Sequence, residues 1–316
     1  MIPLNLIKDL KKEELNLGIP LHSELIGKEF NKQYFTELNE KKASTTFAID
    51  GGCAVLVDAG TWTISKIKIG IVSYTGLKKD FEQTKDYYLK IIQKKDYELK
   101  LFDELGQDIK IDFPDFSKFD IDELQSKVMK ILEWKTCLNL CNQNKKLLIL
   151  IDGGIEPDNE VEQETINQIK KTDNTVIGFC KTSRMRTTTG RNVLGVVNGL
   201  SEKKKSWYYY PLFNNEKETF TLIGKLHNHA KSCHKIQLFN LENINEIFNI
   251  LCFFCNDSEI IGYPYPLLKV DKIARINSFE KKKEKNFAEK ELKKSNIFED
   301  VQNYEFHSNL DNRMYR

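Results

Sequence analysis

Two apolar segments of this chain each run into the triplet Asp-Gly-Gly. FAID (47–50) and LLILID (147–152) are typical of buried strands, and the second is continuous enough for a central strand covered on both faces. Each strand places one carboxylate, Asp50 or Asp152, before glycines that allow another backbone or a phosphate to approach closely. One Asp-Gly pair alone would indicate a common turn. Two copies at the ends of two central strands indicate a ligand site at one edge of a sheet.

The spacing of apolar residues predicts an α/β fold, an RNase H-like mixed sheet flanked by helices. An antiparallel meander followed by βαβ crossovers is the expected chain order. The predicted strands are 45–50 with its continuation CAVLVDAG, 62–74 with a possible bulge, 147–152, 175–180 and further strands within 206–239. The predicted helices are 80–95, 120–144, 158–171, 240–256 and 266–277, with an exposed hairpin or loop in the rest of 76–120.

Helical extensions are expected at both ends of this domain. Residues 1–44 are predicted to form an N-terminal helical extension, because apolar residues recur at helical spacing from Leu4 to Leu15. Residues 45–277 form the main domain. The charged tail, 278–316, has few apolar anchors and is expected to be a solvated or partner-binding helix rather than core.

Composition excludes several classes of protein. With 48 Lys+Arg against 46 Asp+Glu in 316 residues, the chain does not act simply by being basic or acidic. Its 40% of hydrophobic residues suffice for a substantial core. An N-terminus unlike a signal peptide, with no apolar run long enough for a membrane span, predicts a soluble cytoplasmic protein. Seven scattered cysteines fit a reducing compartment rather than a disulfide framework.

Two groups of cysteines and histidines are candidate metal or redox sites. They are the pair Cys252 and Cys255, and the cluster His227, His229, Cys233 and His234. The first lies in an apolar helical segment, which favours packed thiols over a redox or zinc pair. The second lies between two predicted strands, which favours a polar turn, with zinc as the less favoured alternative.

Two further carboxylates are candidates for the site at the sheet edge. Glu133 precedes Asp152 by one helix, a spacing that can bring it over the same edge; the alternative is a solvated helix glutamate. Asp271 shares a helical face with apolar residues; the alternative is an ion pair with Arg275, and both can hold. Carboxylates without a His or Cys nucleophile suit Mg²⁺ or Mn²⁺. The hypothesis is a metal-dependent phosphodiesterase, in which a pair of ions activates water.

A cluster of basic residues follows the strand at 175–180. GFCKTSRMRTTTGR (178–191) contains Lys181, Arg184, Arg186 and Arg191, although the whole chain has few arginines. Arginine suits bidentate contact with phosphate, so this segment is predicted to bind DNA backbone. The alternative is a solvated loop.

The chain resembles the NurA family of archaeal and bacterial nucleases. The resemblance spans about residues 45 to 277 and rests on FAIDGG (47–52), Glu133 before LILIDGG (148–154), GFCKTS (178–183), KLHNH (225–229) and GYPYPLLKVDKIARI (262–276). The last motif is the most specific. The insertion at 76–118 and the tail beyond 277 have no counterpart in this resemblance.

The resemblance implies Mn²⁺-dependent cleavage of DNA, as a single-strand endonuclease and 5′–3′ exonuclease, by a homodimer that works with a HerA-like hexameric ATPase in end resection and double-strand break repair. It implies that Asp50, Glu133 and Asp152 bind metal, that Tyr263 lines the site, that Lys181 contacts phosphate, and that Asp271 replaces a histidine of some relatives as ligand or base. The alternatives are a HerA-coupled defence nuclease and a non-catalytic scaffold on the ATPase ring.

Overall fold

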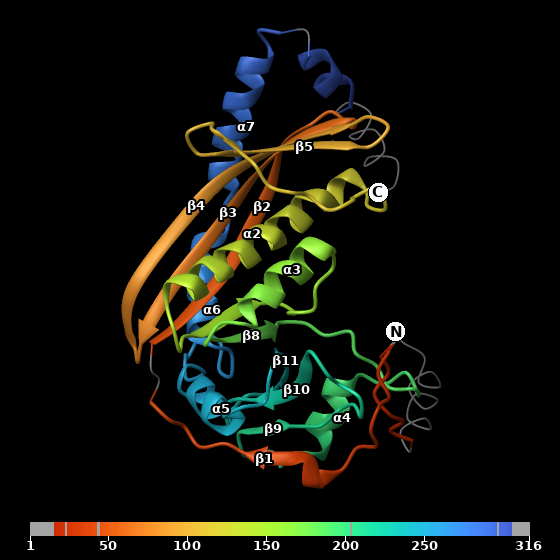
Figure 1. Cartoon of the computed structure of the whole chain (residues 1–316), viewed down its shortest axis with the longest axis vertical. Helices are drawn as coiled ribbons and strands as arrows, with labels where there is room; N and C mark the ends of the chain where they lie inside the picture. The colour runs from red at the N-terminus through yellow and green to blue at the C-terminus, as the bar shows by residue number, and fades with distance from the viewer. Residues whose placement is uncertain (1–15, 23, 43–44, 203, 296, 305–316) are drawn as a thin grey trace, which may run out of the picture.

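The fold is built on one large mixed sheet (Figure 1). The computed structural model describes residues 16–304 except 23, 43–44, 203 and 296. Within these residues 11 strands form the sheet, in the order β1-β9-β10-β11-β8-β7-β2-β3-β4-β5-β6. The strands are β1 (Phe35–Glu37), β2 (Thr45–Asp58), β3 (Trp62–Thr75), β4 (Lys78–Gln93), β5 (Tyr97–Asp103), β6 (Asp108–Ile109), β7 (Leu148–Asp152), β8 (Thr175–Cys180), β9 (Trp207–Tyr209), β10 (Phe220–Lys225) and β11 (His234–Leu238).

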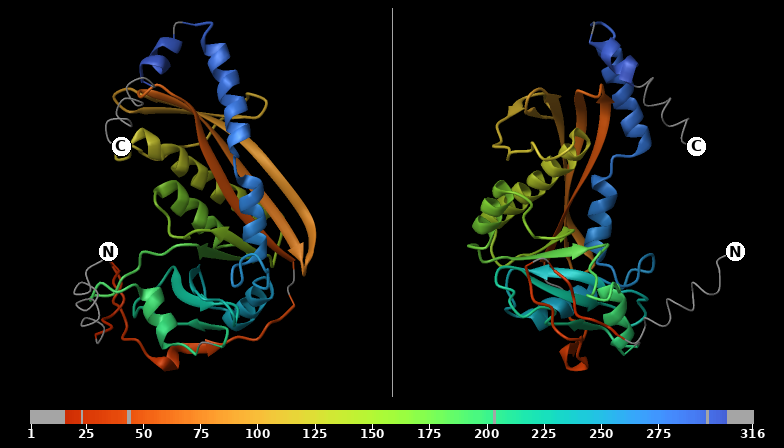
Figure 2. Two further views of the ribbon diagram at one scale, coloured as in Figure 1. Left: turned by 180° about the vertical axis from the view of Figure 1, so that it is seen from behind. Right: turned by 90° about the vertical axis from the view of Figure 1, so that its right-hand side faces the viewer.

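Helices cover both faces of this sheet. They are α2 (Ile121–Gln143), α3 (Glu160–Ile169), α4 (Val193–Leu200), α5 (Ile244–Phe253), α6 (Tyr265–Ala274) and α7 (Ser278–Leu292). In Figure 2, α2 and α3 lie on one face and α6 and α7 on the other. The alternation of β2 explains this arrangement: Ile49 packs in the core with α2, and Ala48 packs in the core with α5 and α6. The expected α/β fold, a mixed sheet flanked by helices, is confirmed.

The first half of the sheet is an antiparallel meander of long strands. β2 pairs with β3, β3 with β4 and β4 with β5. The helix predicted over 80–95 is wrong, because residues 80–93 belong to β4 and the chain then bends toward β5. Tyr87, Leu89 and Ile91 are buried at every second position, while the segment from Lys78 to Lys85 is exposed throughout. Pairing with β3 therefore determines the conformation of a segment whose polar half carries no strand pattern of its own.

The second half begins with parallel strands. β7 pairs in parallel with both β2 and β8, and the helix α3 connects β7 to β8. β11 then adds antiparallel to β8. α2 begins with a capping box between Asp120 and Glu123. These connections bring the end of β7 beside the middle of β2.

The N-terminal extension differs from its prediction. Residues 4–15, whose spacing suggested helices, lie outside the described residues. Within 16–42, except residue 23, the described chain has a 3-10 turn at Lys32–Tyr34 and the strand β1, and no α-helix. This segment runs along the second half of the sheet, where β1 pairs with β9. The prediction of helices is therefore wrong for 16–42.

The C-terminal extension does contain a helix, α7, but it is docked rather than solvated. Lys66 of β3 has a side chain only 3% exposed, and its ammonium pairs with Glu280 at 2.9 Å and Glu284 at 2.6 Å, both on α7. Beyond the helix, Val301 is buried against Leu56 and Val57 of β2. Charge pairing across the sheet thus anchors a helix whose own sequence shows no apolar stripe.

Candidate functional site

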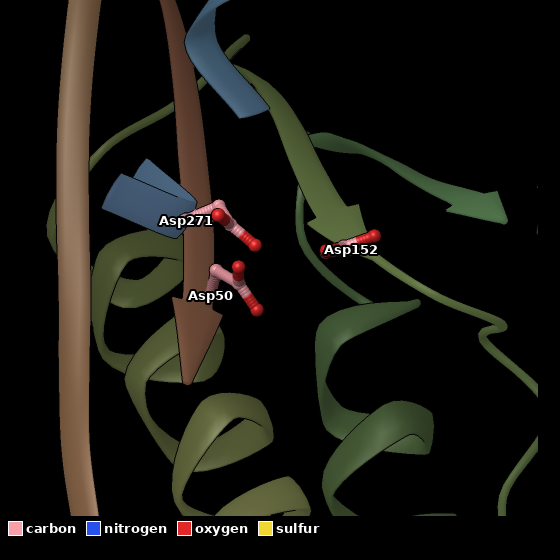
Figure 3. Close-up of side chains that lie close together, drawn as sticks. All are labelled: Asp50, Asp152 and Asp271. Atoms are coloured by element: carbon pink, nitrogen blue, oxygen red, sulfur yellow. The ribbon is translucent and has the colours of Figure 1, made fainter. Parts of the chain in front are cut away.

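Three aspartates from three elements converge at the carboxyl end of β7 (Figure 3). They are Asp50 of β2, Asp152 of β7 and Asp271 of α6, and each offers one oxygen within 4.8 Å of the others. The register explains the first two: Ile49 pairs with Ile151, so the aspartates are the next residues on adjacent parallel strands. Among the described residues no other group of three His, Cys, Asp or Glu side chains is arranged this way.

Asp50 lies inside a strand rather than at its end, which corrects the prediction from the Asp-Gly-Gly motif. β2 continues to Asp58, whereas β7 stops at Asp152. Beyond Ile49, β7 therefore no longer pairs with β2. The carboxylates lie where β7 ends and β2 continues. Because Asp50 is inside β2, the main chain of this strand gives it a fixed position.

Glycines beside Asp50 allow helices to approach from both faces. A Cβ on Gly52 would lie 2.2 Å from the backbone oxygen of Ala274, so only glycine lets α6 pack this closely. A Cβ on Gly51 would lie 2.7 Å from a carboxylate oxygen of Glu133 on α2. The motif thus admits α6, which carries Asp271, on one face and Glu133 on the other.

Glu133 belongs to the same hollow but not to the group of three. Its side chain is buried, so the alternative of a solvated glutamate is excluded. A hollow of about 400 Å³ is lined by Asp50, Glu133 and Asp152 together with Lys130. Glu133 approaches from the α2 face, whereas Asp271 comes from the opposite face. The carboxylate of Glu133 lies 3.4 Å from the ammonium of Lys130.

A lysine lies directly between two of the aspartates. The ammonium of Lys181, the residue after β8, contacts Asp152 and lies 2.7 Å from Asp271. Arg275 also pairs with Asp271 at 2.7 Å. Asp271 therefore both forms the ion pair with Arg275 and lies in the group of three aspartates. The hydroxyl of Tyr263 donates to Asp152 at 3.4 Å.

Burial and mutual repulsion perturb these carboxylates. Burial, together with the charges of Asp152 and Glu133, raises the pKa of Asp50 to about 8. Burial also raises the pKa values of Asp152 and Glu133, against the opposing effects of Lys181 and Lys130 respectively. For Asp271 burial acts in the same direction, but Lys181 and Arg275 outweigh it and lower the pKa. The cluster therefore favours a neighbouring positive charge.

The predicted DNA-binding arginines lie on the loop that begins at Lys181. Arg184 and Arg186 are exposed, and Arg191 is half-buried. The N-terminal segment holds this loop through its backbone: the N–H of Leu21 donates to the carbonyl of Arg186 and the N–H of Thr188 to the carbonyl of Ile19, both at 2.9 Å. Of the four basic residues predicted here, Lys181 is the one in contact with the aspartates.

The chemistry of the donor set fits a hard divalent cation. The three carboxylates each offer an oxygen within 4.8 Å of the others, which matches the preference of Mg²⁺ and Mn²⁺ for oxygen ligands. Burial of Asp50 also disfavours its charge unless a cation compensates it. The histidine and cysteine groups do not form such a site among the described residues. Cys252 and Cys255 are buried free thiols, as the favoured interpretation of their segment predicted.

One residue of the hollow, Lys130, was missed by sequence reasoning. Its ammonium lies 5.4 Å from the centre of the Trp134 ring and, with a side chain 19% exposed, faces Glu133. The signal was present in the sequence, since Lys130 precedes Glu133 by three positions on one helix. This spacing alone does not distinguish a lysine beside a buried site from one in a surface ion pair, so the burial of Glu133 was needed to identify Lys130.

The residues of the site lie in a recognised protein domain. A family model described as the NurA domain matches residues 44–276, which includes all three aspartates, Glu133 and Lys181. The chain belongs to the NurA family. The family match ends two residues before α7 begins, so α7 lies outside the NurA domain.

Solved NurA structures share the fold at low identity. The NurA nuclease from Sulfolobus solfataricus is 17% identical and has a TM-score of 0.58, with 92% of this chain and 93% of that chain covered. A second NurA crystal structure is 9% identical, with a TM-score of 0.51 and coverage of 86% and 92%. No curated protein sequence matches the chain. None of the described helices is long and apolar enough to span a bilayer.

Proposed function

We propose that this protein is a metal-dependent deoxyribonuclease that hydrolyses phosphodiester bonds with Mn²⁺ or Mg²⁺. The observation that carries this proposal is the convergence of Asp50, Asp152 and Asp271, within 4.8 Å of one another, in a chain of the NurA family. The solved relative from Sulfolobus solfataricus is described as a nuclease, which supports the same activity here.

The three aspartates would hold the metal, with Glu133 as a further ligand from the α2 face. A pair of divalent ions, when bound, supplies an activated water and stabilises both the attacking and the leaving oxygen. Tyr263 orients Asp152 through its hydroxyl. Lys181 neutralises Asp152 and Asp271 in this structure, and its ammonium is placed to contact a phosphate that enters beside them.

The loop after Lys181 would hold the DNA backbone. The guanidinium groups of Arg184 and Arg186 are exposed, and arginine can bind a phosphate with two parallel hydrogen bonds. Because the N-terminal segment fixes the loop backbone, these side chains project from a defined position. They would contribute binding rather than chemistry.

Conservative substitutions test the proposal. Asp50→Asn and Asp152→Asn keep the shape of the side chain and remove its charge, so we expect Mn²⁺-dependent digestion of single-stranded DNA to fall at least about a thousand-fold. Asp108→Asn, on an exposed residue of β6, is the matched control and should digest normally. Full activity of either site variant, or wild-type activity undiminished by EDTA, would refute the mechanism. Wild-type protein that binds DNA without digesting it under any divalent metal would favour the scaffold.

We further propose a homodimer that works with a HerA-like hexameric ATPase in end resection and double-strand break repair. Membership of the NurA family supports this assignment. Co-purification of the chain with the ATPase encoded beside it, and stimulation of digestion by ATP, would test the partnership. If deletion of the gene left break repair intact but removed resistance to phage, the role would be defence.

A further inference from the structure

The charges of α7 are sorted between its two faces. Toward the sheet, Glu280 and Glu284 pair with Lys66, and Glu280 also pairs with Lys68 at 2.7 Å. Toward solvent, the exposed side chains of the first three turns include Lys281, Lys282 and Lys283. The helix therefore presents a basic outer face even though its sequence alternates acidic and basic residues.

Two phenylalanines interrupt this basic face. Phe279 is 78% exposed and Phe287 is 69% exposed, and with Lys283 they occupy positions i, i+4 and i+8 of one helical stripe. Eight residues of helix separate the two rings by about 12 Å along the axis. Large aromatic side chains at this exposure do not contribute to the core of the protein.

A hollow beside Phe287 offers further aromatic surface. It has a volume of about 500 Å³, and Leu56, Ile64, Tyr88 and Phe102 of the meander line it together with Phe287. This volume is in the range of small-ligand pockets and would admit a nucleobase. Asp103, Glu104 and Glu284 also line the hollow, so contacts with phosphate belong to the lysines of the helix and not to this hollow.

The stripe follows the candidate site along the chain. Asp271 of α6 pairs with Arg275, which is 69% exposed, and Ser278 begins α7 three residues later. A strand whose phosphate lies at Asp271 and Lys181 would therefore pass Arg275 before it reaches Phe279. Figure 2 shows α6 and α7 following one another along the same face of the sheet.

We propose that the outer face of α7 is a binding surface for single-stranded DNA, along which the substrate strand extends from the site. The proposal rests on the proposed nuclease function. Lysines attract the phosphates, and Phe279 and Phe287 provide faces on which unpaired bases stack. Exposed aromatic rings among lysines are the combination found in proteins that bind single strands without sequence preference. Double-stranded DNA offers no free base faces and would use the lysines alone.

The experiment measures binding of the full chain to oligonucleotides of two lengths. Fluorescence anisotropy in Ca²⁺, which we expect to occupy the site with little cleavage, would compare a dinucleotide, which extends little beyond the phosphate at the site, with a 25-nucleotide strand. The double variant carries both Phe279→Ser and Phe287→Ser. We expect its affinity for the long strand to fall about 5- to 50-fold and its affinity for the dinucleotide to stay unchanged. Leu77→Ser, at a residue 78% exposed elsewhere, is the matched control.

The lysines have a separate signature. Replacing Lys281, Lys282 and Lys283 with Gln should reduce the slope of log affinity against log salt for the long strand by about two. Unchanged binding of the long strand in both variants would overturn the proposal. A loss of self-association in the phenylalanine variant, with DNA affinity unchanged, would overturn it too and assign the stripe to an interface between copies.

The test separates this proposal from the nuclease function. Cleavage of the dinucleotide in Mn²⁺ reports on the aspartates alone and should be normal in every α7 variant. If wild-type protein digests no DNA but the α7 variants still lose affinity for the long strand, the binding surface stands and the nuclease proposal fails. If digestion is normal and the variants bind the long strand as tightly as wild type does, the nuclease proposal stands and the binding surface on α7 fails.

Discussion

Asp50 and Asp152 occupy equivalent positions on two adjacent parallel strands. The pairing of Ile49 with Ile151 places both carboxylates at the same height and on the same side of the sheet. The third aspartate, Asp271, is positioned by a single helix, α6. The geometry of the site is therefore set mainly by backbone hydrogen bonds and by the packing of α6.

The packing of α6 on Gly52 leads to the first prediction. In Gly52→Ala the new methyl group would overlap the backbone oxygen of Ala274, so α6 must move and carry Asp271 away from the other aspartates. We expect a loss of about 1–3 kcal/mol in the free energy of unfolding and weaker binding of Mn²⁺ in calorimetry. Gly199→Ala, where the added methyl has no neighbour within 4 Å, is the control and should bind normally. Equal metal affinity in both variants would contradict the prediction.

Removing Lys181 should make the fold more dependent on metal. In Lys181→Met the carboxylates of Asp152 and Asp271 lose a shared positive partner, so we expect the Tm in EDTA to fall by about 2–4 °C and the stabilisation by Mn²⁺ to exceed that of the wild type. Digestion of DNA should be strongly reduced. Lys272→Met, which breaks an exposed ion pair with Glu259, should change neither quantity. The prediction fails if Mn²⁺ stabilises Lys181→Met and wild type equally.

The buried ammonium of Lys66 predicts a large effect on stability. It pairs with Asp86 at 2.6 Å as well as with two glutamates of α7. Lys66→Met therefore removes the cation beside Asp86 and Glu284 and leaves Glu280 paired with Lys68 alone. Urea unfolding should show a loss of about 3–5 kcal/mol. Lys68→Met, whose ion pair involves a single glutamate, should lose less. If both variants unfold at the same urea concentration as wild type, charge pairing does not anchor α7.

Glu216 predicts a pH dependence of stability away from the site. Burial, with a smaller contribution from Glu156, raises its pKa from 4.5 to about 7, although Oε1 accepts a hydrogen bond from the backbone N–H of Thr221 at 2.7 Å. The folded state thus holds a proton that the unfolded state releases, and stability falls as the pH rises from about 4.5 to 7. Glu216→Gln should therefore gain stability relative to wild type at pH 8 and not at pH 4.5, as measured by urea unfolding. A difference that is constant between these pH values would contradict the assignment.

The candidate site was largely predictable because its signals are local. An apolar run that ends in Asp-Gly-Gly indicates both the strand and the carboxylate at the site, and helix α6 follows from the spacing around Asp271. The position of Glu133 on the other face of β2 was not predictable, since it depends on which residues of β2 face α2. The three-carbon reach of its side chain then brings it to the hollow.

The misassigned elements depend on partners far away in the chain. The outer half of β4 is exposed and polar on both faces, so only its pairing with β3 makes it a strand. α7 lacks an apolar stripe, and its partner Lys66 lies more than 200 residues earlier. Periodicity in a short window carries no information on such contacts.

The continuation of β2 through the site divides its ligands into fixed and adjustable ones. Asp50 is held within a strand that pairs with β3 along nearly its whole length, so its position cannot change without disturbing the sheet. Asp271 sits near the end of a ten-residue helix, and Lys181 begins a loop. Adaptation to a different ion or a different substrate conformation would therefore be expected through α6 and the loop, with β2 as the invariant reference for both.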